Sequence, residues 1–254
     1  MLPVGRSRLA LAGASLAYGT GLFVAYEASR PKPPLLTCEQ RRDRFAELAQ
    51  GYDGDVHCDE QSSGILAWRQ ELVAQARGRV LEIAGGTGRN LEHFPAAVSE
   101  LVVGDNCEAM LQVAARRVAE ARVGGGAACC PSAVTLAVMD ASALPFADDS
   151  FDTVVDTFGV CSFEAPVQAL REMGRCCKPG GAVLLLEHGA SSLAPLRWWQ
   201  AHRLNRHVDR WGCYWNRDIE GMVAESGLRV VSVQRRHLGT TVMLRCEPAK
   251  GEAS

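Results

Sequence analysis

The stretch VLEIAGGTGRN, residues 80–90, decides the fold. Its apolar first half, residues 80–84, is typical of a buried strand and carries Glu82, after which glycines turn the chain into a helix. The glycines of the bend are Gly85, Gly86 and Gly88. Glycines allow positive φ and a close approach of the backbone to a ligand. The dinucleotide fingerprint G-x-G-x-x-G fails here because Leu91 stands at its last position, and no Gly-Lys-Ser/Thr follows to make a P-loop.

Apolar runs alternate with helical stretches along the rest of the chain. Strands are expected at residues 101–103, 134–139, 153–158, 182–186, 230–233 and 242–244. A helix is expected over residues 108–122, and a second one presents Val167, Leu170, Gly174 and Cys177 on one face. The last two strands predict a closing hairpin with Gly239 near its turn. Alternation of this kind predicts an α/β fold with a parallel sheet covered on both faces.

Three successive predicted strands each have an acidic residue near their carboxyl end. Glu82 lies in the first, Asp105 ends the second 23 residues later, and Asp140 ends the third. Open α/β sheets bind their ligands at the carboxyl ends of the strands, where an acid can accept both ribose hydroxyls. We therefore expect Asp105 to hold a ribose and Asp140 to accept from an adenine amino group.

The composition is that of an ordinary globular protein. The 254 residues include 27 Lys+Arg and 29 Asp+Glu, a net charge of −2, which argues against a nucleic-acid partner. The ten cysteines include two vicinal pairs, Cys129 with Cys130 and Cys176 with Cys177, and no C-x-x-C. We interpret them as buried thiols in a reducing compartment, and no metal site is predicted.

Residues 9–26, LALAGASLAYGTGLFVAY, are 18 consecutive residues without a charge. At about 1.5 Å per residue, a helix of this length can span a bilayer core. We interpret it as a single-pass membrane anchor; a cleaved secretory signal peptide, a targeting leader or a buried helix are the alternatives. Arg6 and Arg8, with no acid before Glu27, also suit a mitochondrial import signal. More basic residues follow the stretch than precede it, which places the following domain in the cytosol or matrix.

Small residues recur on one face of this stretch. Gly13, Ala17 and Gly21 are four apart, a spacing that lets two membrane helices pair. The predicted organisation is an anchor or targeting segment at 1–30, a linker at 31–44, the main domain at 45–247 and a tail at 248–254. The proline-rich start of the linker is expected to be stiff.

Four segments carry a resemblance to a known family. They are VLEIAGGTGR, VVGDN, MDASALPFADDSFD and CCKPGGAVLLLEHG. Together they resemble the class I S-adenosylmethionine-dependent methyltransferases over roughly residues 45–247. The resemblance implies a Rossmann-like sheet of seven strands in the order 3-2-1-4-5-7-6, here preceded by the anchor helix.

A narrower resemblance rests on four other segments. FDTVVDTFGVCSFEAPVQALREMGR, LLLEHG, WGCYWNRDI and RRHLGTT are similar to the membrane-anchored methyltransferase-like group that includes mitochondrial inner-membrane members. Thiol methyltransferases of the endoplasmic reticulum and lipid droplets look like more distant relatives. This resemblance favours a mitochondrial inner-membrane location, with the endoplasmic reticulum as the alternative.

The family pattern E/D-x-G-x-G-x-G assigns roles around the bend. Ala84 replaces its first glycine, whereas Gly86 and Gly88 are retained. By resemblance, Gly85, Gly86 and Gly88 would hold the methionine part and ribose of S-adenosylmethionine. Glu82 would orient the bend and reach the amino group through water.

The remaining cofactor contacts are also carried over by resemblance. Asp105, followed by Asn106, would hold the ribose hydroxyls. Asp140 and the backbone of Ala141 would face the adenine, and Phe158 would lie near the methyl end. The alternative is that these residues are only turn and cap residues.

His188, after the fifth strand, is the candidate general base or orienting residue on the acceptor side, because imidazole titrates near neutral pH. A structural histidine bonded to backbone is the alternative. Cys161 and Ser162 follow the fourth strand and are candidates for the pocket wall, with packing as the other role for Cys161.

Residues 195–217 are rich in tryptophan and arginine. The segment could lie at a membrane interface, roof the acceptor pocket, or pack its tryptophans on the sheet. Trp199 is a pocket candidate, and Asn216 and Arg217 match the family pattern and are kept as further candidates.

Two functions are compatible with these observations. The first is methyl transfer from S-adenosylmethionine to a small hydrophobic or membrane-associated acceptor of quinone, lipid or thiol type. The second is a membrane-anchored assembly or scaffold protein that retains the fold without catalysis, suggested by Ala84 and by the lack of a clear acceptor base.

Overall fold

The computed structural model of the protein describes residues 21–22, 25–26, 29, 34–123, 131 and 133–249. The chain divides into two compact units, Met1–Pro34 and Leu35–Ser254. The expected anchor at residues 9–26 lies mostly outside the described residues, as do Gly13 and Ala17 of the expected pairing face. Among the helices that the structure describes, none combines the length and apolar character needed to cross a bilayer.

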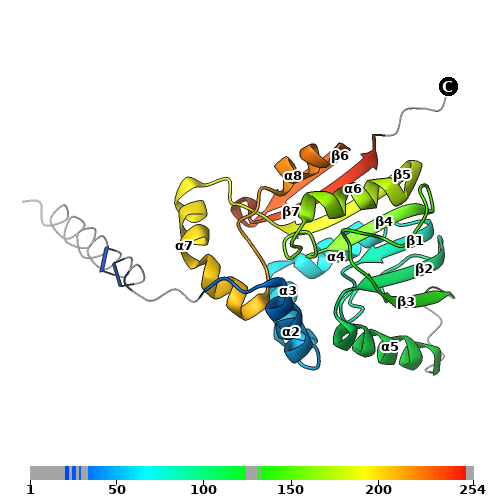
Figure 1. Cartoon of the computed structure of the whole chain (residues 1–254), viewed down its shortest axis with the longest axis horizontal. Coiled ribbons are helices and arrows are strands. Elements are labelled where there is room, and N and C mark those ends of the chain that lie inside the picture. Colours follow the sequence, from blue (N-terminus) through cyan, green and yellow to red (C-terminus); the bar gives the residue numbers. More distant parts are fainter. Residues whose placement is uncertain are drawn as a thin grey trace, which may run out of the picture. The chain divides into compact units, whose positions relative to one another are not determined.

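Seven strands of the second unit form one sheet in the order β3-β2-β1-β4-β5-β7-β6 (Figure 1). The strands are β1 (Gly78–Ile83), β2 (Val98–Asp105), β3 (Val134–Val138), β4 (Phe151–Thr157), β5 (Cys177–His188), β6 (Leu228–Arg236) and β7 (Thr241–Pro248). Strands β1 to β5 pair in parallel, and β7 runs antiparallel to both β5 and β6. The expected strand order and closing hairpin are confirmed.

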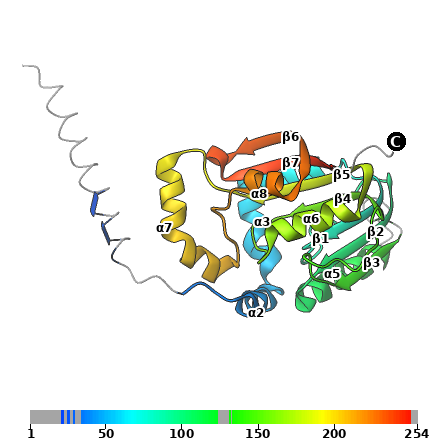
Figure 2. The ribbon, with the colours of Figure 1, turned by 45° about the horizontal axis from the view of Figure 1, so that its top comes forward.

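Helices cover both faces of this sheet. The elements are α2 (Cys38–Leu48), α3 (Tyr52–Ser63), α4 (Ile65–Val73), α5 (Glu108–Val123), α6 (Pro166–Cys176), α7 (Ala194–Trp211), α8 (Ile219–Ser226) and the short helix η1 (His237–Gly239). Side chains of α6 and α8 share one buried cluster, and those of α4 and α5 share another. Figures 1 and 2 show α6 and α8 together on one face of the strands. The central strands are therefore buried on both sides, which is why their sequences are almost continuously apolar.

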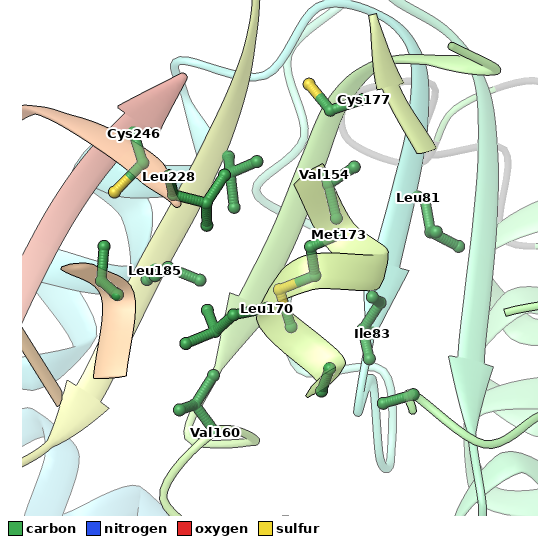
Figure 3. Close-up of a cluster of buried hydrophobic side chains, with 14 of the residues drawn as sticks. Leu81, Ile83, Val154, Val160, Leu170, Met173, Cys177, Leu185, Leu228 and Cys246 are labelled. Atoms are coloured by element: carbon green, nitrogen blue, oxygen red, sulfur yellow. The ribbon is translucent and has the colours of Figure 1, made fainter. Parts of the chain in front are cut away.

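The core under α6 explains the pattern read from its sequence. Leu170 and Met173 are fully buried and point at the strands that carry Val154 and Leu185 (Figure 3). The expected helical face extended to Cys177, but α6 ends at Cys176 and Cys177 begins β5. The proline at position 179 disfavours helical geometry in the residue before it, so the chain leaves the helix early.

Helix α2 occupies part of the range expected to be a linker, residues 31–44. Thr37 caps it: its hydroxyl accepts from the Gln40 amide N–H at 3.3 Å, and the Gln40 side chain accepts from the Thr37 N–H at 2.9 Å. This reciprocal pair is a capping box, which satisfies two orphan donors at a helix start. The helix belongs to the second unit and ends in a small apolar cluster with Cys107 and Met110 at the start of α5.

Candidate active site

The bend after β1 requires glycine for two different reasons. A Cβ on Gly85 would lie 2.2 Å from Val103 Cγ1, and one on Gly88 would lie 2.5 Å from Leu91 Cδ1. Gly86 and Gly88 have positive φ, 55° and 77°. Ala84 also has a positive φ, 51°, so it adopts the conformation that the family's glycine would favour. The replacement therefore leaves a left-handed backbone at this position.

A cavity of about 880 Å³ opens beside this bend, at the carboxyl ends of β1, β2, β3 and β4. Its volume is within the usual range for a small-molecule site, roughly 300–1,000 Å³. Seven of the predicted cofactor residues line it: Gly85, Gly86, Asp105, Asn106, Asp140, Ala141 and Phe158. The other two, Glu82 and Gly88, are buried next to the bend without lining the cavity.

Asp105 fastens the bend to the next strand. Its Oδ2 accepts from the Gly86 N–H at 2.9 Å, and its Oδ1 accepts from the Cys107 N–H at 2.8 Å. Burial raises the pKa of Asp105 above its usual value although these N–H groups favour the charged form. An ionised carboxylate has about four acceptor positions, so Asp105 can also accept from a ligand hydroxyl.

The far side of the cavity combines an exposed acid with apolar surface. Asp140 Oδ1 accepts from both the N–H and the hydroxyl of Ser142, each at 2.8 Å. Val138, one of the lining residues, leaves 61% of its surface exposed beside Met139. A flat apolar ring with an amino donor at its edge would be complementary to this arrangement.

Glu82 is buried with one of its oxygens unpaired. Its Oε1 accepts from Asn90 Nδ2 at 2.7 Å, whereas Oε2 has no hydrogen-bond partner among the described residues. Burial raises the pKa of Glu82 to about 7. A buried polar atom without a partner is costly, so this oxygen is suited to a donor supplied by a ligand or a water. Because Glu82 does not line the cavity, a ligand amino group there would reach this oxygen through a water.

A buried charge network supports the bend from beneath. Arg69 Nη1 donates to Asn90 Oδ1 at 3.0 Å and to Thr157 Oγ1 at 2.8 Å. Its Nη2 donates to Glu60 Oε1 at 2.6 Å. Burial opposes ionisation of Glu60, but the Arg69 and Arg89 guanidinium groups outweigh it and lower the pKa of that carboxyl. Helices α3 and α4 are thereby joined to β1 and β4.

The network continues to the far end of the bend. Arg89 Nη2 donates to Glu60 Oε2 at 2.6 Å, and Arg89 Nη1 donates to Asp53 Oδ1 at 3.3 Å. Asp53 also accepts from the Thr87 hydroxyl at 2.7 Å. Arg117 of α5 pairs with Asp53 and donates to the Gly88 carbonyl at 3.1 Å. No motif in the sequence pointed to these residues.

Helix α2 supplies the roof of the cavity. Five of its residues line it: Cys38, Glu39, Arg41, Arg42 and Phe45. Arg41 Nη1 donates to the Tyr214 hydroxyl at 2.7 Å, and Cys38 Sγ contacts the Glu164 carboxylate beyond β4. One alternative for residues 195–217 was that they roof the acceptor pocket. In the described part of the chain, α2 forms this roof instead, because no residue of α7 lines the cavity. The capping sequence at residues 37–40 was the signal that could have revealed this helix.

His188 lies behind the cavity wall. Its ring is 4.4 Å from that of Phe158, centroid to centroid, and Phe158 itself lines the cavity. His188 Nδ1 is 3.6 Å from Cys213 Sγ. In the described structure His188 is therefore separated from the cavity by Phe158, which suits a positioning role better than direct proton transfer.

The other acceptor-side candidates lie outside the cavity lining. Cys161 is fully buried and donates to the Phe158 carbonyl at 3.3 Å. Arg217 Nη1 donates to the Val160 carbonyl at 2.6 Å. Trp199 and Asn216 are half-buried, and the Arg203 guanidinium carbon lies 5.3 Å from the Trp199 ring centroid. Ser162, by contrast, lines the cavity.

A pair of buried carboxyl groups holds the turn after β4. Asp156 Oδ2 accepts from the Val160 N–H at 2.8 Å, and Glu187 Oε2 accepts from the Cys161 N–H at 3.0 Å. Burial raises the pKa of Asp156 to about 6 and that of Glu187 well above its usual value. Two adjacent buried carboxylates cannot both ionise cheaply, which favours a proton shared by the pair.

The segment that builds this site is similar to a known family of protein domains. Residues 81–185 match the family model described as a methyltransferase domain, which begins in β1 and ends in β5. Over residues 81–185 the chain is thus similar to the methyltransferase domain family. The strand order of the sheet agrees with that similarity.

Two relatives and one solved structure are similar to this chain. It is 29% identical over 228 residues to the mitochondrial methyltransferase OMS1 of Saccharomyces cerevisiae, covering 85% of this chain and 48% of that protein. It is 38% identical to the ubiquinone/menaquinone biosynthesis C-methyltransferase UbiE of Pseudomonas fluorescens, covering 61% of this chain and 60% of that one. The chain thus spans about half to three fifths of these relatives.

The solved structure is a phosphoethanolamine N-methyltransferase of Haemonchus contortus in complex with S-adenosyl-L-methionine. The TM-score is 0.51 at 21% identity, over 66% of this chain and 38% of that one. At this identity the likeness concerns the fold alone.

Proposed function

We propose that this methyltransferase transfers a methyl group from S-adenosylmethionine to a small, apolar acceptor of the quinone type. The observation that carries the proposal is the cavity at the carboxyl ends of the central strands, with the glycine bend, Asp105 and Phe158 in its wall. Open α/β sheets bind ligands at this edge.

The residues present fit the cofactor on chemical grounds. The Asp105 carboxylate lines the cavity and suits the ribose hydroxyls, and the unpaired Glu82 Oε2 suits a water that also accepts from the amino group. Val138 and Met139 offer the adenine an apolar face, with Asp140 and Ala141 at its edge. When bound, S-adenosylmethionine supplies an electrophilic methyl group on a sulfonium.

The chain's own contribution to the reaction is positioning and charge. Substitution at carbon needs the nucleophile in line with the methyl group and in its reactive protonation state. Phe45, Phe158 and Phe163 line the cavity and would exclude water from an apolar ring. Arg41 and Arg42 also line it, and their positive charge favours a deprotonated hydroxyl on the acceptor. An anionic hydroquinone is a carbon or oxygen nucleophile of the required kind.

The printed names of the relatives support the acceptor class. UbiE methylates at carbon in ubiquinone and menaquinone biosynthesis by its name, and its similarity to this chain favours a quinone precursor over a lipid or thiol. The mitochondrial designation of OMS1 supports a mitochondrial location. Nucleic acid is not proposed as a partner, given the charge balance.

Membrane attachment through residues 9–26 is part of the same proposal. The apolar length of this segment and the hydrophobicity of a quinone acceptor support it. A single-pass anchor in the inner mitochondrial membrane would bring the domain close to a membrane-dissolved substrate. Pairing of two anchors through Gly13, Ala17 and Gly21 is proposed on their spacing alone.

Isothermal titration with S-adenosylmethionine and S-adenosylhomocysteine tests the cofactor half of the proposal. We expect the full chain to bind with a Kd in the micromolar range. The affinity should be at least tenfold weaker in Asp105→Asn, which removes the charge of the side chain and keeps its shape. Asp59→Asn, at an exposed position of α3, is the matched control and should bind as the native chain does. No heat with native protein would overturn the cofactor assignment.

Turnover separates the enzyme from a scaffold protein. Membranes containing the full chain are supplied with S-adenosylmethionine and a short-chain demethylated hydroquinone, and S-adenosylhomocysteine is measured. Acceptor-dependent product supports the proposal. Cofactor binding without turnover on hydroquinone, alkyl thiol or lipid would instead favour the non-catalytic assembly role.

A further inference from the structure

Three side chains from separate parts of the chain converge behind Phe158. Cys161 follows β4, His188 ends β5, and Cys213 follows α7. The two sulfur atoms are 3.2 Å apart, and His188 Nδ1 is 3.6 Å from Cys213 Sγ. One ligand atom from each residue lies within 4.8 Å of the other two. These residues play no direct part in the cavity described above.

We propose that Cys161, His188 and Cys213 form a binding site for a thiolate-preferring divalent metal ion, with zinc as the expected occupant. In tetrahedral zinc sites, Zn–S bonds of about 2.3 Å and Zn–N bonds of about 2.0–2.1 Å place sulfur atoms about 3.8 Å apart and sulfur and nitrogen about 3.5 Å apart. The distance of 3.6 Å from Cys213 Sγ to His188 Nδ1 agrees with these values, the two sulfur atoms at 3.2 Å are somewhat closer, and all three ligand atoms lie within 4.8 Å of one another. Small rotations of the three side chains would bring these atoms to the separations of a zinc site.

The backbone around the three ligands is held independently of any metal. The Tyr214 N–H donates to the Cys161 carbonyl at 2.8 Å, which joins the two cysteine segments. The Cys161 N–H is bound by Glu187 at 3.0 Å, and Gly212 ends α7 with a φ of 69°. Ligands fixed by their surroundings lose little entropy on binding, so a preformed site of this kind favours metal affinity.

The surroundings suit the charge of a zinc–dithiolate centre. Two thiolates and one neutral imidazole around Zn²⁺ have no net charge, which a buried position tolerates. Cys161 is fully buried and Cys213 is 6% exposed. Three protein ligands leave a fourth position open for water or an exogenous ligand, as in catalytic zinc sites.

A metal at this position would fix one wall of the cavity. The His188 ring lies 4.4 Å from the Phe158 ring, centroid to centroid, and Phe158 lines the cavity. Coordination would lock the His188 ring and thereby the orientation of Phe158. The site itself does not depend on the proposed methyl transfer, so it is tested without an activity assay.

Metal content of the untagged full chain is the first test. After incubation with Zn²⁺ and gel filtration, elemental analysis is expected to find about one zinc per chain, falling at least tenfold in Cys213→Ser and in His188→Asn. Cys246→Ser is the control, because Cys246 is equally buried on β7 and lies outside the cluster. A native chain free of zinc, or equal zinc in Cys213→Ser and Cys246→Ser, would overturn the proposal.

Cobalt substitution and thiol labelling test the ligands without relying on a folded variant. Native chain loaded with Co²⁺ is expected to show thiolate-to-cobalt charge transfer and the strong visible bands of tetrahedral Co²⁺. Cys161 and Cys213 should resist alkylation until a chelator is added. If peptide mass spectra of native protein kept under reducing conditions instead show a Cys161–Cys213 disulfide, the pair is a redox couple and the metal site is refuted.

Discussion

At the scale of single residues, the bend after β1 shows how a family pattern can change without losing its geometry. Ala84 stands where the pattern has glycine, yet its φ of 51° lies in the left-handed region that glycine favours. This conformation is less favourable for an L-residue by roughly 1–2 kcal/mol. The surrounding contacts must therefore hold Ala84 in it, and the bend is strained at this position.

Substituting Ala84→Gly is expected to stabilise the protein. Relief of the left-handed strain outweighs the greater freedom of glycine in the unfolded chain, and we expect a gain of about 0.5–1 kcal/mol. Urea unfolding of both chains measures it. The control is Ala74→Gly at the end of α4, where φ is −60° and the same change should destabilise by a similar amount. Equal destabilisation in both variants would contradict the strain argument.

Glu82 makes stability depend on pH in a defined direction. Its folded pKa of about 7 exceeds the usual 4.5, so the folded chain keeps a proton that the unfolded chain has lost between these values. The unfolding free energy therefore falls as pH rises from about 4.5 to 7, by at most about 3 kcal/mol. We expect Glu82→Gln to flatten that slope in urea unfolding, whereas Glu120→Gln, exposed on α5, should leave it unchanged.

The same linkage applies to cofactor binding. The cationic amino group would favour the ionised form of Glu82, so the affinity for S-adenosylmethionine should rise with pH through about 7 in the native chain. In Glu82→Gln the affinity should be weaker and nearly independent of pH over that range. A steep pH dependence that persists in Glu82→Gln would assign it to another group.

At the scale of elements, the bend depends on helices that were not recognised as part of the site. Glu60 of α3 lies between Arg69 of α4 and Arg89 after the bend, and all three are buried or half-buried. Removing one member of a buried ion pair leaves its partner without compensation. The helices before the sheet therefore determine how rigidly the glycine backbone is presented.

Arg69→Met should destabilise the protein and weaken cofactor binding together. We expect a loss of about 3–5 kcal/mol in urea unfolding, because Glu60 and Asn90 lose a buried donor. In Arg69→Met the Glu60 carboxylate keeps Arg89 as a partner but loses Arg69, so the double variant Arg69→Met with Glu60→Gln, which makes this buried group neutral, should recover part of the loss. Arg122→Met, exposed in the last turn of α5, controls for loss of a positive charge. Failure of the double variant to recover any stability would contradict the ion-pair argument.

At the scale of the whole molecule, the features that could be predicted from the sequence are those set by residues close together in the chain. The strands, the bend at Gly86 and the acids at 105 and 140 follow from periodicity and from motifs whose residues are neighbours in sequence, whereas the strand order was implied by the resemblance to a known family. The network around Glu60 and the cluster of Cys161 and Cys213 join residues that are distant in sequence. Such contacts produce no regular spacing in the sequence, because only folding brings these residues together.

The roof of the cavity is the last consequence of this whole-molecule assembly. Phe45 of α2 lines the cavity and packs so closely on the end of α7 that a Cβ on Gly212 would lie 2.7 Å from its ring. Phe45→Ala should remove apolar wall from the roof of the cavity. We expect the acceptor KM to rise about tenfold or more, with the cofactor Kd unchanged within about twofold.

Initial rates of S-adenosylhomocysteine formation against hydroquinone concentration give the KM, and titration calorimetry gives the cofactor Kd. Leu35→Ala, which trims an exposed apolar side chain, is the matched control and should change neither. Equal losses in both constants would mean that Phe45 acts through the fold, because a residue confined to the acceptor wall cannot weaken cofactor binding to the same degree. An increase in KM alone would establish that α2 is part of the acceptor site.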